Sequence, residues 1–349
     1  MYKNPHPNPH YMNPDWQTIT ANPHALQAEL AVTDIPFTRT LSHDAPRKTY
    51  RRRNEEQKTT VHWGQRKLLM SEIEFLLMTQ NPKKQCTVIY AGAAPGTHVR
   101  VLAEMFPRHT FILVDPAPFT VRPERGRIHI HQAMFTDELA NELRQSLQQR
   151  NTRILFISDV RSCDPDYHSE QVHTERINAD MRAQARWHRI LRPFKSMLKF
   201  RLPYAPGSTE YLKGDIHLPV WGPPSTTECR LIVTDPGTQR YDHTDHEEKM
   251  FHFNTVTRVA LYPHTVCGCG IDHCYDCTAE VGILKAYLAA TGKDDSDRSV
   301  AQLSALISSS ISSQRTLAHK SPERSEKLSV IRKHQWKDGK PSYERFLDP

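Results

Sequence analysis

The sequence predicts an α/β fold in which a mostly parallel β-sheet carries helices on both faces. Between residues 46 and 290, short apolar runs rich in β-branched residues alternate with longer segments of helical period. This alternation is typical of parallel strands joined by crossover helices. The chain has 349 residues, which is enough for one large domain of this class with extensions at its ends.

Strands and helices are expected to alternate along this region. Short apolar runs predict the strands, and longer segments with apolar residues three or four positions apart predict the helices. The expected strands are 87–91, 110–115, 127–131, 153–158, 196–201 and 229–234, and the expected helices are 67–79, 98–106, 137–149 and 171–191. Because an open parallel sheet binds ligands at the carboxyl ends of its strands, functional residues are expected directly after each strand.

The two ends of the chain are expected to lie outside this domain. Residues 1–45 are rich in Pro, His and Asn and show no helical or strand period, which predicts a flexible arm. Residues 291–349 are polar and charged, which predicts a partly disordered tail with one short helix around 300–309. One domain over residues 46–290 is therefore expected between them.

Composition and charge narrow the class of protein. No apolar run approaches the roughly 20 residues of a membrane span, and the first residues lack the apolar core of a signal peptide, so a soluble, unsecreted protein is expected. The formal net charge of +7 suits a polyanionic partner. The basic run RKTYRRR at 47–53 fits either a nucleic-acid groove or a solvated linker.

A glycine-rich turn, YAGAAPGTH, follows the first expected strand. Gly92 and Gly96 allow a ligand to approach the backbone closely, and the helix that begins next offers unpaired amides. Asp115 ends the second strand, where a carboxylate can accept both hydroxyls of a ribose or, alternatively, cap a helix. Since the turn departs from G-x-G-x-x-G and no Walker lysine follows it, S-adenosylmethionine is favoured over a dinucleotide or ATP.

Two lysines and two carboxylates lie inside or at the edge of apolar segments: Lys67, Asp159, Lys199 and Glu228. Each alone is more often a surface charge, but burial is costly without a partner, so the four could neutralise one another in one cleft. Lys199 is the most unusual, because the strand SMLKF is otherwise apolar. A lysine whose pKa is lowered by burial and a second cation can deprotonate a ribose 2′-hydroxyl without a metal.

These segments, in this order, resemble the K-D-K-E ribose 2′-O-methyltransferases, in particular the poxvirus cap-specific enzymes that double as the small subunit of a viral poly(A) polymerase. The resemblance covers roughly residues 63–254 in the blocks GQRKLLMSEIEFL, YAGAAPGTHVR, FISDVRS, LKFRLPY, TECRL and EEKMFHFN. It implies a Rossmann-like S-adenosylmethionine-dependent methyltransferase sheet. It also implies that Lys67, Asp159, Lys199 and Glu228 are the catalytic tetrad, with Lys199 as general base.

The resemblance implies a methyl-donor site as well. Its expected residues are Gln65, Tyr90, Gly92, Gly96, His98 and Asp115, with Phe135, Thr136 and Arg161 close by.

For the cap, the resemblance implies aromatic rings that stack on the cationic 7-methylguanine and carboxylates that read its edge. Tyr204 matches one ring and Glu247 one carboxylate, and Tyr50 is a candidate for the second ring. Tyr204 could alternatively be an ordinary packed loop aromatic.

Three positions depart from the family pattern. Pro206 replaces an aspartate beyond the stacking ring, Ser225 a tyrosine before the glutamate of the tetrad, and Ala117 an arginine after Asp115. The tetrad is intact, and Trp221 is a candidate to compensate as a stacking partner for the cap.

A cysteine and histidine cluster, YPHTVCGCGIDHCYDC, occupies residues 262–277. Such density fits a structural zinc site, free thiols in a loop, or a disulfide pair. The candidate zinc ligands are Cys267, Cys269, Cys274 and Cys277, accompanied by His264 and His273.

The predicted function is therefore methyl transfer from S-adenosylmethionine to the ribose 2′-hydroxyl of the cap-proximal nucleotide of capped mRNA. The alternatives are ribose methylation of non-cap RNA, and an RNA-binding processivity subunit of a poly(A) polymerase. The expected partners are the capped mRNA 5′ end and a poly(A) polymerase catalytic subunit, with no membrane. The resemblance implies a viral protein in the host cytoplasm or the virion.

Overall fold

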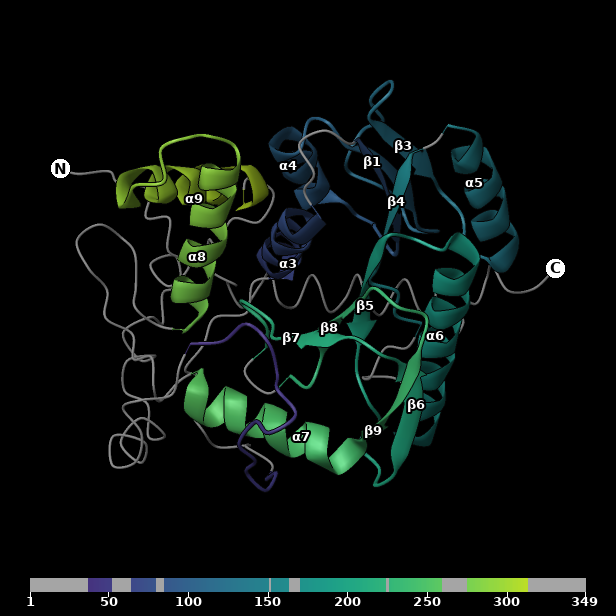
Figure 1. The fold of residues 1–349 in the computed structure, drawn as a ribbon, viewed down its shortest axis with the longest axis vertical. Helices are drawn as coiled ribbons and strands as arrows, with labels where there is room; N and C mark the ends of the chain where they lie inside the picture. Colours follow the sequence, from purple (N-terminus) through teal and green to yellow (C-terminus); the bar gives the residue numbers. More distant parts are fainter. Residues whose placement is uncertain are drawn as a thin grey trace, which may run out of the picture.

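A computed structural model describes residues 37–51, 64–79, 85–150, 152–162, 170–223, 226–258 and 275–312. Their centre is a seven-stranded sheet with strand order β3-β2-β1-β4-β5-β8-β7. Helices α3 (Gly64–Thr79) and α4 (Thr97–Met105) cover one face of the sheet, and α5 (Asp137–Gln149) and α6 (Glu170–Leu191) cover the other (Figure 1). The predicted fold class is therefore confirmed.

Five neighbouring strands of the sheet are parallel: β3 (Ile128–His131), β2 (Thr110–Val114), β1 (Cys86–Ala91), β4 (Arg153–Ser158) and β5 (Lys195–Phe200). Next to β5, β8 (Cys229–Val233) runs antiparallel, and β7 (Asp215–His217) is antiparallel to β8. All six predicted strands are present. Every residue of β1 and β8 is buried, as expected for strands covered on both faces.

Sequence periodicity missed several elements beyond β5. β6 (Ser208–Leu212) and β9 (Thr238–Asp242) form a separate antiparallel pair, and α7 (His243–His252) continues into a single π-helical turn, Phe253–Thr257. α8 (Tyr275–Ala290) was also missed. Because β6, β7 and β9 are short and only partly buried, their apolar pattern is too brief to recognise.

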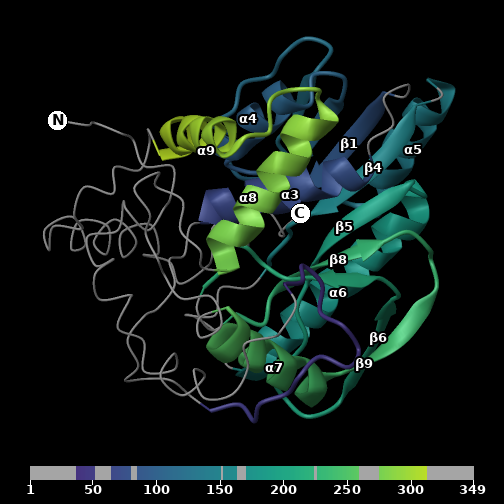
Figure 2. The same ribbon diagram turned by 60° about the vertical axis from the view of Figure 1, so that its left-hand side comes forward.

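The described residues near both predicted ends pack on the domain. Leu41 N donates to Ile216 O at 2.8 Å, and Arg39 pairs with Glu74 at 3.0 Å, so the last part of the expected arm 1–45 is attached. The helix expected around 300–309 is longer, α9 (Asp297–Ser312). Figure 2 shows α8 beside α3 and α9 beside α4, and these pairs are in contact. Described residues outside the predicted range of 46–290 therefore contact the sheet and its helices.

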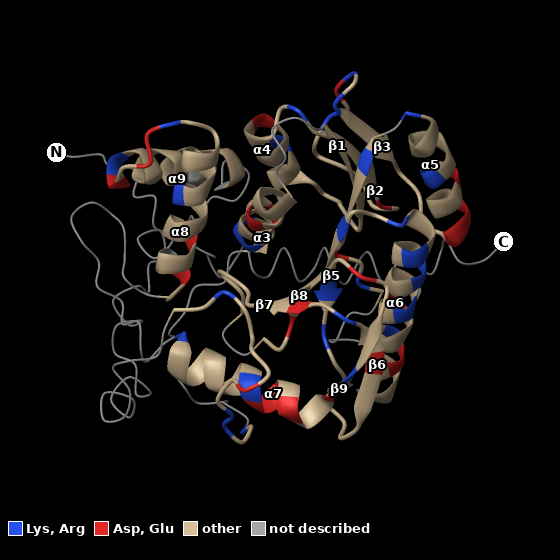
Figure 3. Cartoon of the chain, viewed as in Figure 1, with Lys and Arg blue, Asp and Glu red and all other residues tan. Residues whose placement is uncertain are grey.

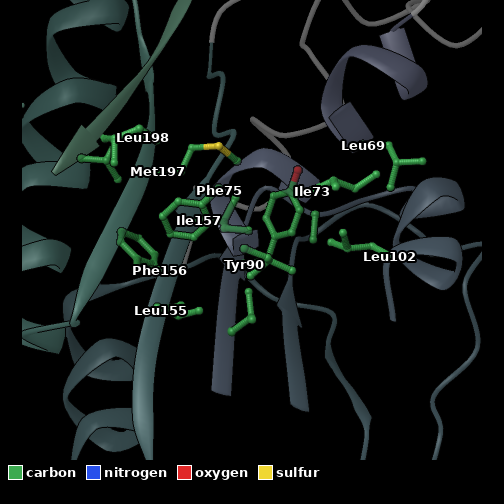
Figure 4. Packing of buried hydrophobic residues seen from close by; sticks show 14 of the residues in the cluster. Leu69, Ile73, Phe75, Tyr90, Leu102, Leu155, Phe156, Ile157, Met197 and Leu198 are labelled. Atoms are coloured by element: carbon green, nitrogen blue, oxygen red, sulfur yellow. The ribbon is translucent and has the colours of Figure 1, made fainter. Parts of the chain in front are cut away.

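The core joins the helices of one face to the central strands. Phe75 from α3, Tyr90 from β1 and Ile157 from β4 lie side by side, and Met197 and Leu198 continue the layer from β5 (Figure 4). All five side chains are buried, and each large apolar side chain contributes about 1.5–3 kcal/mol. This packing fixes α3 against the carboxyl edge of the sheet.

Within the described ranges, no helix is long and apolar enough to cross a membrane.

Candidate active site

Four charged side chains meet at the carboxyl ends of β4 and β5. Lys67 Nζ lies 2.8 Å from Glu228 Oε1, and Lys199 Nζ lies 3.0 Å from Asp159 Oδ1 and 3.6 Å from Glu228 Oε2. Figure 3 shows charged positions of β5 and β8 coming together at this edge. The predicted convergence of the tetrad is confirmed, whereas the catalytic role of each residue stays a prediction.

Strand register explains why these residues meet. Asp159 directly follows β4, and its amide donates to Ala91 O at 2.9 Å, which extends the pairing of β4 with β1. β8 lies antiparallel to β5 with Cys229 opposite Phe200, so Glu228 enters the sheet where β5 ends. Helix α3 brings Lys67 to the same edge.

Two arginines enlarge the tetrad. Arg230 Nη2 lies 2.7 Å from Asp159 Oδ1, and its Nη1 lies 3.4 Å from Glu228 Oε1. Arg161 Nη2 donates to Glu228 Oε2, although the sequence predicted Arg161 near the methyl donor. Two lysines and two arginines thus surround two carboxylates; we call these six residues the catalytic cluster. Arg230 was missed, although a charged residue in the apolar strand CRLIV was its signal.

The buried position of Lys199 in the catalytic cluster shifts the pKa of its amine. Burial lowers its pKa most, and Arg161 and Arg230 lower it further, while Asp159 and Glu228 oppose the change. Burial alone would raise the pKa of both carboxyls, but Lys199 and Arg230 outweigh it and hold both below their ordinary range. The amine of Lys199 therefore loses its proton more readily than an ordinary lysine, beside two carboxylates that stay ionised.

The glycine-rich turn is shaped first by the protein's own packing. Gly92 has φ +79°, and a Cβ there would lie 2.8 Å from Val160 N. Gly96 has φ +70°, and a Cβ there would lie 2.8 Å from a methyl group of Val121. Both glycines let the loops after β1, β2 and β4 approach one another. Gly96 also caps α4 without a side-chain hydrogen bond, so among the described residues no side chain caps the first amides of that helix.

Asp115 lies at the same edge, directly after β2. Its Oδ2 accepts from Ala94 N at 3.1 Å and its Oδ1 from Ala117 N at 2.8 Å, so the carboxylate stabilises the loops after β1 and β2. A carboxylate offers about four acceptor positions, so Asp115 retains capacity for the hydroxyls of a ribose. Burial raises the pKa of this carboxyl.

Three residues expected to line the donor site instead join a buried cluster around Glu72. Tyr90 Oη donates to Glu72 Oε1 at 2.8 Å, His98 Nε2 lies 2.9 Å from the same oxygen, and His98 Nδ1 lies 2.8 Å from Gln65 Oε1. Tyr90 and His98 are each 1% exposed, so protein covers their side chains, and their place in the donor site stays a prediction. They tie α3, β1 and α4 together. Glu72 was missed.

Phe135 and Thr136 also have structural partners. The Phe135 ring is buried, with its centroid 4.8 Å from that of Trp187. Thr136 Oγ1 accepts from Leu139 N at 3.2 Å and caps α5. Any contact of Phe135 with the donor would therefore come from its backbone.

Comparison with known proteins identifies the family. A sequence-family model described as "Poly A polymerase regulatory subunit" matches residues 36–288. The chain belongs to this family. α9 lies beyond the matched range.

Two viral proteins that are similar to this chain carry the same name. The cap-specific mRNA (nucleoside-2′-O-)-methyltransferase of myxoma virus (strain Lausanne) is 28% identical over 225 residues, covering 59% of this chain and 64% of the relative. The fowlpox virus (strain NVSL) protein of the same name is 28% identical over 217 residues, covering 56% and 68%. The chain thus spans slightly less than two thirds of the myxoma virus relative.

A structure described as "The structure of bluetongue virus VP4 reveals a multifunctional RNA-capping production-line" matches 68% of this chain and 40% of that chain. The sequence identity is 13% and the TM-score is 0.39, too remote a likeness to support an argument.

Three of the four candidate cap-binding residues lie in or next to α7. Tyr204 is 40% exposed, and its Oη accepts from Arg201 Nη2 at 2.8 Å. Its loop is fastened to α7, because His243 Nδ1 lies 2.8 Å from Ala205 O. One turn further along α7, Glu247 is partly buried, and burial followed by repulsion from Glu248 raises its pKa.

Tyr50 and Trp221 differ in exposure. Tyr50 is 45% exposed, and its ring contacts that of Phe251 edge-to-face, with the centroids 5.3 Å apart. Tyr50 therefore packs against α7, which contains Phe251. Trp221 is completely buried, its indole N–H donates to Glu280 at 2.7 Å and its backbone N–H to Asp276 at 2.9 Å. The proposal that Trp221 stacks on a cap is therefore wrong, because protein covers both faces of its ring.

The predicted zinc ligands lie outside the described residues, except for the backbone of Cys277 in α8. Within the part of the chain that the structure describes, no three His, Cys, Asp or Glu side chains are grouped to hold a metal ion. The zinc site stays an untested prediction.

Proposed function

We propose that this protein transfers a methyl group from S-adenosylmethionine to the ribose 2′-hydroxyl of the cap-proximal nucleotide of capped mRNA. The observation that carries the proposal is the catalytic cluster, in which Lys199 contacts both Asp159 and Glu228 at the carboxyl edge of the sheet. Membership of a family with relatives named cap-specific mRNA methyltransferases supports it.

The edge beside β1 and β2 fits the methyl donor. The half-buried Asp115 carboxylate would accept the ribose hydroxyls, and the uncapped amides at the start of α4 would bind the donor's carboxylate. S-adenosylmethionine supplies an electrophilic methyl group on a positively charged sulfur. Tyr90 and His98 would support the donor site indirectly, because their contacts with Glu72 hold α3 and α4 against β1.

Lys199 would take the proton from the 2′-hydroxyl. Its lowered pKa increases the neutral fraction of the amine, and a general base of this kind contributes about 10²–10⁴ in rate. The proton would end on Nζ, where Asp159 and Glu228 stabilise the ammonium group. Lys67 would hold Glu228 in place through their contact at 2.8 Å.

Recognition of the cap would fall to the exposed aromatics around α7. The cationic 7-methylguanine would stack on Tyr204, with Tyr50 as the second ring, since a cation is attracted to the face of an aromatic ring. The Glu247 carboxylate would accept from the edge of the base.

Methyl transfer from labelled S-adenosylmethionine to a short RNA, with and without its cap, tests the proposal. Lys199→Met should slow transfer to the capped RNA by about 10²–10⁴. Lys195→Met is the matched control, because Lys195 begins the same strand at its other end. Equal transfer by wild type and Lys199→Met would refute the proposal, and equal transfer to both RNAs would favour methylation of non-cap RNA.

The family description supports a second role, binding to a poly(A) polymerase catalytic subunit. This role is compatible with the first, and co-purification of the two chains tests it. Failure to bind, in a preparation that methylates capped RNA, would leave only the enzymatic role. Action in the cytoplasm, expected from the resemblance, stays a prediction.

A further inference from the structure

The backbone of Glu228 lies just before the chain enters the sheet. The pairing of β8 with β5 begins at Cys229, so Glu228 is just outside the ladder. Its amide donates to Thr226 Oγ1 at 3.0 Å, a bond within the same short segment. The place of the Glu228 carboxylate in the catalytic cluster therefore depends on what holds residues 226–228.

Helix α7 and the π-helical turn that follows it hold this segment. His246 Nε2 donates to Thr227 O at 3.0 Å, and Asn254 Nδ2 donates to Thr226 O at 2.7 Å. Asn254 Nδ2 also donates to Met250 O at 2.9 Å, which fixes its side chain on this face of the helix. Two side chains of one helical segment thus bind two consecutive carbonyls (Figure 1 shows α7 below β7 and β8).

This contact between α7 and the segment before β8 is buried. His246 is 5% exposed and Asn254 is 2% exposed. The His246 ring meets Phe200 of β5 edge-to-face, with the centroids 5.3 Å apart, and Met250 Sδ lies 3.3 Å from Cys229 Sγ. Burial lowers the pKa of His246 to about 4, so its imidazole is neutral over the pH range in which a lysine titrates. Because a buried carbonyl without a donor is unfavourable, loss of either side chain would favour displacement of the segment.

Displacement of this segment would change the surroundings of the candidate general base. The Glu228 carboxylate lies 2.8 Å from Lys67 Nζ and 3.6 Å from Lys199 Nζ. Its charge raises the pKa of Lys199, against the larger effect of burial. Since the attraction between charges weakens with distance, a displaced Glu228 would raise this pKa less and would stabilise the ammonium group less.

We propose that His246 and Asn254 are positioning residues, which set the distance of Glu228 from Lys199 through the backbone of residues 226–228. The role rests on the proposed function, in which Glu228 stabilises the protonated amine of Lys199. Glu247, the candidate cap carboxylate, directly follows His246. One helix would therefore carry a group that reads the cap and also fix a carboxylate of the catalytic cluster.

The pH dependence of methyl transfer in single turnovers tests this role. In His246→Met the rate at high pH should fall about 10–10²-fold, because a small misplacement beside the reacting atoms is costly. The inflection should move to lower pH, because a displaced Glu228 raises the pKa of Lys199 less. The steady-state KM for capped RNA should stay near the wild-type value. His246→Gln, whose amide can donate to the same carbonyl, should restore the rate and the inflection.

Thr226→Val is a second variant, which removes the hydroxyl group that accepts from the Glu228 amide. The two side chains have nearly the same shape and Thr226 is only partly buried, so this variant stays informative if His246→Met folds poorly. The inflection should move in the same direction as in His246→Met.

Thr244→Ala is the matched control, because Thr244 is exposed on α7, and it should keep the wild-type rate and inflection. A lower rate with an unshifted inflection in both variants would mean that the contacts only stabilise the fold, and would overturn the inference. A wild-type rate and inflection in His246→Met would overturn it as well. No methylation of capped RNA by wild type would overturn the proposed function, and the inference with it.

Discussion

Helix α3 contributes side chains to two groups of charged residues. The two groups differ in their ratio of cations to carboxylates and in their exposure to solvent. Lys67 belongs to the catalytic cluster, while its neighbour Arg66 belongs to a second group, the buried cluster of Arg66, Glu280, Arg258 and Asp276. Arg66 Nε donates to Glu280 at 2.7 Å, and Arg258 Nε lies 3.0 Å from Asp276. Trp221 bonds to both carboxylates and joins the two pairs.

The two clusters differ in their numbers of cations and carboxylates. In the buried cluster two arginines face two carboxylates, and these four side chains are at most 5% exposed. In the catalytic cluster four cations face two carboxylates, and Arg161 is 45% exposed. Closed, balanced pairs hold α3 and the segment after α7 to α8, whereas in the catalytic cluster burial lowers the pKa of one lysine, Lys199. We infer that the first cluster maintains the fold and the second performs chemistry.

Breaking the buried cluster should have the largest effect on stability. Arg66→Met leaves Glu280 buried without its cation and should lower the free energy of unfolding by about 3–5 kcal/mol, measured by urea denaturation. Lys285→Met, which removes an exposed pair with Asp297, is the control and should unfold like wild type. Wild-type stability of Arg66→Met would show that the buried cluster does not maintain the fold.

Removal of the candidate cap-stacking ring should affect substrate binding and leave both clusters unchanged. Tyr204→Ala should raise KM for capped RNA about tenfold, because stacking on an aromatic ring contributes about 1–3 kcal/mol. Phe194→Ala, which removes a second exposed aromatic just before β5, serves as control. An unchanged KM in Tyr204→Ala would support the alternative that Tyr204 is an ordinary loop residue.

Loss of Lys199 should cost little stability, in contrast to loss of Arg66. Three cations remain beside Asp159 and Glu228, so Lys199→Met should change the free energy of unfolding by less than about 1 kcal/mol. The same urea titration measures it. A loss comparable to that of Arg66→Met would indicate that both clusters are structural.

Sequence reasoning succeeded where a single residue contradicted its surroundings. Lys199 lies in an otherwise apolar strand, and Asp115 and Asp159 directly follow strands, so the pattern alone could predict the positions of all three at the carboxyl edge of the sheet. The parallel strands and their helices were equally recognisable, because each carries a clear period.

The residues that were missed depend on contacts between distant parts of the chain. Arg230 meets Asp159 because β8 pairs antiparallel with β5, and no local pattern encodes that register. Trp221 resembles an exposed loop aromatic next to glycine and proline, but its partner Glu280 lies 59 residues further along the chain. Glu72 looks like one polar position of an amphipathic helix, yet it binds Tyr90 and His98.

The smallest expected change concerns one exposed cation. Arg161 lowers the pKa of Lys199, so Arg161→Gln should move the inflection of the pH–rate profile to higher pH. Because Arg161 is 45% exposed, solvent screening limits the shift. Arg100→Gln, an exposed arginine on α4, is the control and should leave the profile unchanged. A shift to lower pH would contradict the electrostatic role of Arg161.

The pH dependence of methyl transfer to capped RNA, measured in single turnovers, tests the central claim most directly. A general base acts in its neutral form, so the rate should rise with pH and level off at an inflection below the ordinary lysine pKa of about 10.4. The rising limb should disappear in Lys199→Met. A rate that does not depend on pH in wild type, or an inflection at or above the ordinary value, would contradict the account.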